Sequence, residues 1–165
     1  MSRTPIKTMP TRPEKTGGTR VQMALETILC RTRERFELID ITRSLNALLR
    51  QRGMRAGLVI VQSLHTTAAV FINEFQQALL EDIRGLLEKL VARHDNWRHN
   101  DPKLSDCDRK NADSHLRAML LGHTISLPVR NGELALGEWQ SVILAELDGP
   151  RERSINVQML GFAEL

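Results

Sequence analysis

The stretch of sequence that most constrains the fold is residues 56–74, AGLVIVQSLHTTAAVFINE. It contains no proline and is rich in β-branched residues, which favours buried β-structure over helix. A strand that only packs needs no polar residues at its ends. HTTAAVFINE, however, begins with a histidine and two threonines and ends with an asparagine and a glutamate. The polar ends, with His65 at one and Glu74 at the other, therefore need an explanation beyond packing, although Asn73 and Glu74 also suit the start of the helix that follows.

The rest of the chain alternates between β-compatible segments and helical patterns. Strands are predicted over residues 21–33, 36–39, 57–64, 123–129, 135–147 and 155–162. Helices are predicted over 41–53, 75–92 and 112–122, with Asp40 or Thr42 capping the first and Asn73 the second. An Asn-Gly pair within 130–134 predicts a hairpin, and 148–154 reads as a turn. Hairpins at both ends with helices between indicate a single α+β domain with a mixed, largely antiparallel sheet packed with helices.

Charge and cysteine content exclude several classes of protein. Residues 1–19 are rich in proline, glycine and basic side chains, so we predict a disordered basic tail followed by one domain over 20–165. The net charge of the whole chain is +3, of which residues 1–20 carry +4 and the remainder −1. The body is therefore near neutral and lacks a nucleic-acid-binding face. No secretory signal, membrane-spanning run or disulfide framework is evident. The expected location is the cytoplasm.

Three of the five histidines lie where functional sites usually form. His65 falls at a strand end, His99 in the long polar segment 94–111, and His115 near the start of a short helix. Three neutral imidazoles around one divalent ion form a known catalytic pattern, but these spacings make no metal motif on their own. His65 bonded only to a backbone carbonyl is the simpler alternative. Cys107 lies between two acids, which argues against an activated thiolate.

Three blocks of the sequence resemble one family. HTTAAVFINE resembles the HTTA…NE signature of the YjbQ-like family, an uncharacterised protein family. WRHNDP…NADSHLRAMLLG and GELALGEWQSVILAELDGPRERSI resemble two further segments of that family, in the same order. The matching residues are His65, Thr66, Thr67, Asn73, Glu74, His99, Asn111, His115, Trp139, Gln140, Glu146, Asp148 and Arg151. Several multi-residue blocks together make the resemblance specific, and it spans about residues 20 to 163.

The resemblance implies a compact α+β homotrimer and a secondary thiamine-phosphate synthase, which joins a pyrimidine diphosphate to a thiazole phosphate and releases pyrophosphate. It also implies a divalent metal ion, zinc or magnesium, held by histidines. Carried over to this chain, the roles are catalytic for His65, Glu74, Asn111 and His115, substrate-binding for Thr66, Thr67 and Arg151, and metal-binding for His65, His99 and His115. The expected partner is a phosphorylated small molecule, not nucleic acid or a membrane.

Two positions depart from the family pattern, and two other functions stay open. Ala69 stands where the family commonly has glycine, and Glu138 where it commonly has threonine. Glu138 adds an acid beside an expected phosphate site, which affects the substrate preference. A metal-dependent hydrolase would use the same histidines to activate water. A non-catalytic oligomer that stores or senses a ligand would bind without turnover.

Overall fold

The computed structural model of the chain describes residues 21–163, so the predicted basic tail over 1–19 lies outside the described residues. The described strands are β1 (Val21–Arg31), β2 (Glu37–Asp40), β3 (Met54–Ser63), β4 (Ala68–Asn73), β5 (Thr124–Arg130), β6 (Glu133–Leu134), β7 (Ser141–Glu146) and β8 (Glu152–Ala163). The helices are α1 (Thr42–Gln51), α2 (Gln77–Leu90) and α3 (Ala112–Leu121), with one 3-10 turn, η1, over Arg98–Asn100.

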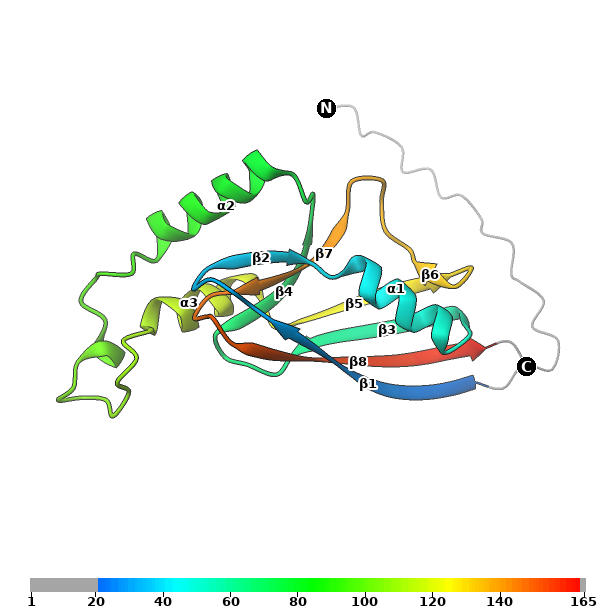
Figure 1. Cartoon of the computed structure of the whole chain (residues 1–165), viewed down its shortest axis with the longest axis horizontal. Coiled ribbons are helices and arrows are strands. Elements are labelled where there is room, and N and C mark those ends of the chain that lie inside the picture. The colour runs from blue at the N-terminus through cyan, green and yellow to red at the C-terminus, as the bar shows by residue number, and fades with distance from the viewer. Residues whose placement is uncertain (1–20, 164–165) are drawn as a thin grey trace, which may run out of the picture.

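The strands divide between two antiparallel sheets (Figure 1). The larger has the order β1-β8-β3-β5-β6 and the smaller the order β2-β7-β4. Consecutive strands belong to different sheets at six places, and two of these concern the candidate site: β3 to β4, and β7 to β8. Each of these connections is short, so both must cross the space between the sheets directly. These crossings position the candidate site.

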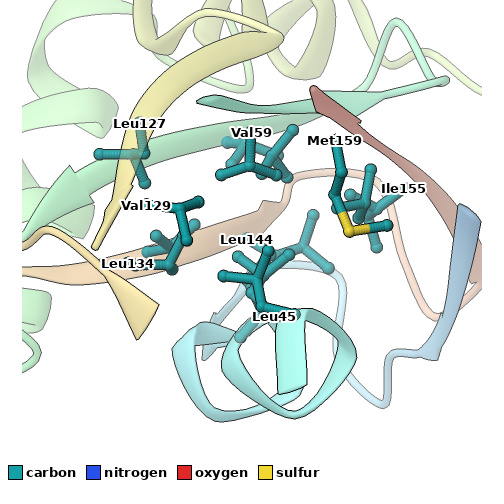
Figure 2. Close-up of a cluster of buried hydrophobic side chains, with 14 of the residues drawn as sticks. Leu45, Val59, Leu127, Val129, Leu134, Leu144, Ile155 and Met159 are labelled. Atoms are coloured by element: carbon teal, nitrogen blue, oxygen red, sulfur yellow. The ribbon is translucent and has the colours of Figure 1, made fainter. Parts of the chain in front are cut away.

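The core lies between the two sheets and α1. Val59 and Met159 from the larger sheet face Leu144 from the smaller one, and Leu45 of α1 closes the cluster (Figure 2). Leu45 and Leu144 are fully buried: the apolar residues of α1 recur at helical spacing, whereas β7 is a continuous apolar run buried on both faces. The other face of the smaller sheet packs on α3 through small residues, including Ala69, so the methyl group at this departure from the family pattern is buried.

The α+β class predicted from the sequence is confirmed. The Asn131-Gly132 hairpin is also confirmed, with φ of 52° and 80° at the two turn residues, as an Asn-Gly turn requires. Several boundaries differ. The predicted strand over 135–147 begins only at β7, after a turn, and the predicted turn over 148–154 ends where β8 begins at Glu152. Residues 65–67 form a turn before β4 and not the start of a strand.

Helix starts differ from the predicted caps. Asn73 is the last residue of β4, and α2 is capped by Gln76, whose side chain accepts from the Leu79 N–H at 2.9 Å. At α1 the N-cap residue is Ile41, while the Asp40 carboxylate accepts from the Thr42 N–H at 2.8 Å. Asp40 thus satisfies the first turn, although it lies one residue before the cap.

Apolar side chains remain exposed on the described surface. On β1, Val21, Met23, Leu25 and Leu29 are between 61% and 72% exposed. Of the apolar stripe predicted for α2, only Leu87 is buried. A single chain leaves such surfaces in water at a cost, and contiguous patches of this kind mark interfaces.

Candidate functional site

The candidate site lies where the two sheet-crossing connections meet the start of α3. Leu64–Thr67 joins β3 to β4, and Leu147–Arg151 joins β7 to β8. Between them is a cavity of about 310 Å³, here called the arginine pocket. It is lined by Leu64, His65, Thr66, Thr67, Asn111, His115, Asp148, Arg151 and Arg153. Six of the residues that sequence reasoning assigned to the site are therefore together: His65, Thr66, Thr67, Asn111, His115 and Arg151.

A buried ion pair forms the floor of the pocket. Glu146 is completely buried and Arg153 has a side chain only 3% exposed. The Arg153 Nε donates to Glu146 Oε2 at 2.6 Å, and the Arg153 Nη2 also donates to Glu146 Oε1. The same Nη2 donates to Thr67 Oγ1 at 3.0 Å, while Glu146 accepts from the Thr32 hydroxyl at 2.9 Å. The pair thus fixes the β3–β4 turn against both sheets.

Three further arginines surround the fully buried Asp148. Arg35 Nη1 donates to its Oδ1 at 2.8 Å, and Arg109 Nε donates to its Oδ2 at 2.8 Å. Arg151 Nη2 reaches the same Oδ2 at 3.4 Å, and Asn111 Nδ2 donates to it at 2.8 Å. Arg109 and Arg151 also both donate to the Asp148 carbonyl oxygen. One carboxylate therefore gathers three guanidinium groups, of which that of Arg151 lines the pocket.

The electrostatic result is a site with excess positive charge. Burial raises the pKa of Asp148, but hydrogen bonds from Arg109 and Asn111 lower it by more, so the pKa lies below the usual aspartate range. Asp148 is therefore ionised at neutral pH, and Arg35 also pairs with the buried Asp113 at 3.3 Å, so three guanidinium groups face two carboxylates and one positive charge is left over. Arg109 and Arg151 have side chains 44% and 37% exposed, which leaves part of each guanidinium accessible to an anion.

His65 is held in one tautomer by the neighbouring strand. Its Nε2 accepts from the Ser154 N–H of β8 at 2.8 Å, so we assign a neutral ring with its proton on Nδ1. Burial and the nearby Arg153 lower the pKa of His65, with a smaller opposing effect from Glu146. No described group accepts a hydrogen bond from the His65 Nδ1. The ring is therefore suited to donate a hydrogen bond from Nδ1 to a bound anion.

His115 and His99 meet edge to face at the side of the pocket. Their ring centroids are 5.1 Å apart with an interplanar angle of 86°. Burial and the nearby His99 lower the pKa of His115, with smaller opposing effects from Asp148 and Asp113. His115 lines the arginine pocket, whereas His99 is exposed in the adjoining loop and contacts the Ser105 hydroxyl at 3.4 Å.

The predicted three-histidine metal site does not assemble in the described part of one chain. Across residues 21–163, no group of three or more His, Cys, Asp or Glu side chains is arranged to hold a metal ion. The Nε2 lone pair of His65 is already used by Ser154, and His99 lies outside the pocket. The zinc or magnesium ion implied by the resemblance stays a prediction, and no chemical step below passes through it.

Glu74 is the other predicted site residue that the fold separates from the pocket. It follows the last residue of β4, while His65 precedes the first. A strand of six residues is about 20 Å long, so the two ends of β4 cannot serve one site within a chain. Asn73 lies at the same end of β4 as Glu74. Trp139 and Gln140 precede β7 at that end of the smaller sheet.

Sequence reasoning missed Arg35 and Arg109, which contact Asp148 without lining the pocket and therefore act as positioning residues. Arg35 pairs with Asp148 across 113 positions of sequence, and Arg109 pairs with it across 39. Neither residue belongs to a recognisable motif. Their place in the site depends on tertiary contacts alone, so no local signal identifies them.

The two-sheet fold and the histidine- and arginine-lined cavity at its crossings define an α+β protein with a polar, positively charged pocket. More particularly, the chain belongs to the YjbQ-like UPF0047 family, whose model matches residues 26–162. It is 44% identical over 144 residues to a UPF0047 protein of Methanothermobacter thermautotrophicus, covering 87% of this chain and 96% of that relative. It is 33% identical to the UPF0047 protein YugU of Bacillus subtilis, covering 83% and 99%.

Solved structures of similar chains share the fold. A protein of unknown function from Sulfolobus solfataricus is 36% identical, with a TM-score of 0.78 over 86% of this chain and 99% of that one. A hypothetical protein from Aeropyrum pernix is 35% identical, with a TM-score of 0.76 over 84% and 98%. None of the helices described within residues 21–163 is both long and apolar enough to span a membrane.

Proposed function

We propose that this protein is an enzyme acting on phosphorylated small molecules, of the secondary thiamine-phosphate synthase type. The observation that carries the proposal is the arrangement around Asp148, where one buried carboxylate orients three arginines beside two histidines of lowered pKa. Such a cluster suits a ligand with several negative charges, because guanidinium groups bind phosphate edges in a bidentate manner.

The proposed reaction places its developing charge where the pocket is most positive. The bond between the pyrimidine methylene carbon and a pyrophosphate oxygen breaks, and the thiazole nitrogen forms the new carbon–nitrogen bond. Pyrophosphate leaves with the bonding electron pair, so negative charge increases on its oxygens. Donors oriented in advance toward a leaving group stabilise that transition state. Arg151 supplies such a donor, and the Nδ1–H of His65 supplies a second.

The remaining pocket residues bind and orient. Thr66 is exposed at the rim, so its hydroxyl is free to donate to a phosphate oxygen. Thr67 is buried and accepts from Arg153, so it mainly fixes the turn that carries His65. Asn111 connects Asp148 to the start of α3 and thereby aligns His115 with the arginines.

Product analysis tests the proposal. Purified protein supplied with the pyrimidine diphosphate and the thiazole phosphate is expected to form thiamine phosphate and pyrophosphate in equal amounts. Complementation of a strain that lacks its main thiamine-phosphate synthase provides the test in cells. Release of inorganic phosphate without coupling would favour the hydrolase alternative. Tight binding of the diphosphate without any turnover would favour a ligand-binding protein.

Replacement of Arg151 should mainly weaken substrate binding. Arg151→Ala is expected to raise the KM for the diphosphate on the order of 10- to 100-fold, because hydrogen bonds to a charged group are lost. Arg151→Lys should recover only part of the affinity, since an ammonium cannot form a bidentate contact. Arg130→Ala, at the exposed end of β5, is the matched control. Equal KM values for Arg151→Ala and wild type would remove Arg151 from the site.

The acid limb of the pH profile should lie below the ordinary histidine range. The pKa values of His65 and His115 are lowered, so both rings stay neutral as the pH falls through about 6.5. Protonation of His65 at lower pH breaks its hydrogen bond from Ser154 and releases the turn. The measurement is kcat/KM from about pH 5 to pH 8, which reports the free enzyme. A limb at or above about pH 7 would contradict this assignment.

We also propose that the protein works as a cytoplasmic homotrimer. The resemblance implies the trimer, and the exposed apolar residues of β1 and α2 supply surface that assembly would cover. Light scattering at micromolar concentration is expected to give three times the chain mass of 18.7 kDa. A stable particle of 18.7 kDa would count decisively against assembly.

A further inference from the structure

A second group of polar and aromatic residues gathers at the far end of the smaller sheet. Asn73 is the last residue of β4 and Glu74 follows it, while Glu138, Trp139 and Gln140 precede β7. Asn73 pairs with Ser141, so the two segments lie next to each other. We call these five residues the strand-end patch. Figure 1 shows the loop before β7 and the segment before α2 at the upper end of the smaller sheet, away from the β3–β4 turn.

Trp139 is the most unusual member of the strand-end patch. Its side chain is 69% exposed, although burial of an indole is strongly favourable. The exposure is not due to a loose loop. Gln140 N–H donates to the Gly137 carbonyl at 3.0 Å, and the Gly137 N–H donates to Gln140 Oε1 at 2.8 Å. This closed turn presents the indole in a fixed position, as expected for an interface anchor.

The patch and the arginine pocket have complementary charges. The patch carries the carboxylates of Glu74 and Glu138, whereas the three guanidinium groups around Asp148 face only two carboxylates, those of Asp148 and Asp113. The pocket also opens beside Leu64, which is 50% exposed. An acidic, aromatic surface and a basic pocket with an apolar rim match each other, but about 20 Å of β4 separates them within one chain.

Two different surfaces that match each other assemble copies head to tail. Such heterologous contacts close into rings when the rotation permits, and three copies give a ring in which every patch meets a pocket. An interface between identical surfaces would instead give pairs. The proposed trimer is therefore the assembly that contact between patch and pocket produces.

We propose that the strand-end patch of one copy completes the arginine pocket of its neighbour. Trp139 then covers the organic part of the substrate, and Glu74 comes close to the pocket that its own chain cannot reach. This inference rests on the proposed function and on the trimer. It assigns catalytic sites to the boundaries between copies, with residues from two chains in each.

Mixed assemblies test the inference. His65→Ala disables the pocket and Trp139→Ala disables the patch, and each variant alone is expected to lose most activity. Co-expressed in equal amounts with different tags and purified through both, the two variants form mixed trimers. Every mixed ring of three then has one boundary that combines an intact pocket with an intact patch, so about a third of wild-type activity should return. No recovery would overturn the proposal.

A matched control separates this result from general effects of mixing. His65→Ala co-expressed with Asp148→Asn places both changes in the arginine pocket, so every boundary keeps a damaged pocket and no activity should return. Glu74→Gln replaces Trp139→Ala as a second patch variant if the latter does not assemble. Full activity of both patch variants alone would also overturn the proposal.

A measurement without catalysis keeps the inference independent of the proposed reaction. Trp97→Phe leaves Trp139 as the single tryptophan, since the chain has two. In the assembled protein, Trp139 fluorescence is expected to resist quenching by acrylamide and to change when pyrophosphate is added. These results without thiamine phosphate formation would support the shared site and reject the synthase. An indole that is freely quenched in the assembled protein would reject the shared site, whatever the activity.

Discussion

Arg153→Met should lower the free energy of unfolding by about 3 to 5 kcal/mol, because it leaves the buried carboxylate of Glu146 without its cation. Glu146 would retain the Thr32 hydroxyl and the Asp148 N–H, which stabilise but do not neutralise it. The measurement is urea unfolding at a fixed protein concentration and neutral pH. Arg50→Met, which breaks the exposed pair with Glu133, is the matched control and should cost less than about 1 kcal/mol.

The double variant identifies the cause. Adding Glu146→Gln to Arg153→Met removes the uncompensated charge while an amide oxygen can still accept from the Asp148 N–H. A substantial part of the lost stability should return, because the cost of breaking a buried pair is mainly that of the remaining charge. If Arg153→Met costs no more than Arg50→Met, the pair does not hold the crossings together.

His65→Ala is expected to reduce kcat by roughly 100-fold or more, the usual loss when an oriented transition-state donor is removed. Stability should fall by only about 1 kcal/mol, since His65 lies in a partly exposed turn and water can replace it on the Ser154 N–H. Turnover in the coupling assay and urea unfolding are measured on the same preparation. His94→Ala, exposed in the loop after α2, is the control and should match wild type in both. Wild-type activity in His65→Ala would mean that the site has been misplaced.

Local patterns in the sequence predict most elements of the fold but not their grouping. Sequence reasoning finds the apolar period of α1, the continuous apolar run of β7 and the Asn131-Gly132 turn, because each is a property of neighbouring residues. The assignment of β3 and β4 to different sheets depends on contacts between distant strands. Thr66 and Thr67 have high β-propensity, so the sequence predicts a strand where the chain in fact turns from one sheet to the other.

The part of the candidate site that the sequence predicts consists of motif residues on the β3–β4 and β7–β8 connections. His65, Thr67 and Arg151 come together because both crossings pass the same point. Glu74 was placed with His65 on the reasoning that both end one strand, although the length of β4 keeps them apart. Arg35 and Arg109 contact Asp148 only in the folded chain, so the residues next to them in sequence do not indicate that they bind this carboxylate.

The pocket is also one of the places where the chain links the two sheets to each other. Leu64–Thr67 and Leu147–Arg151 are the covalent links between the sheets that run along its walls. A ligand that contacts both links binds the native arrangement and has no equivalent site in a chain whose sheets have separated. Its binding free energy is then added to the docking of one sheet on the other. Substrate affinity and resistance to heat are thermodynamically linked here, and selection on either one acts on both.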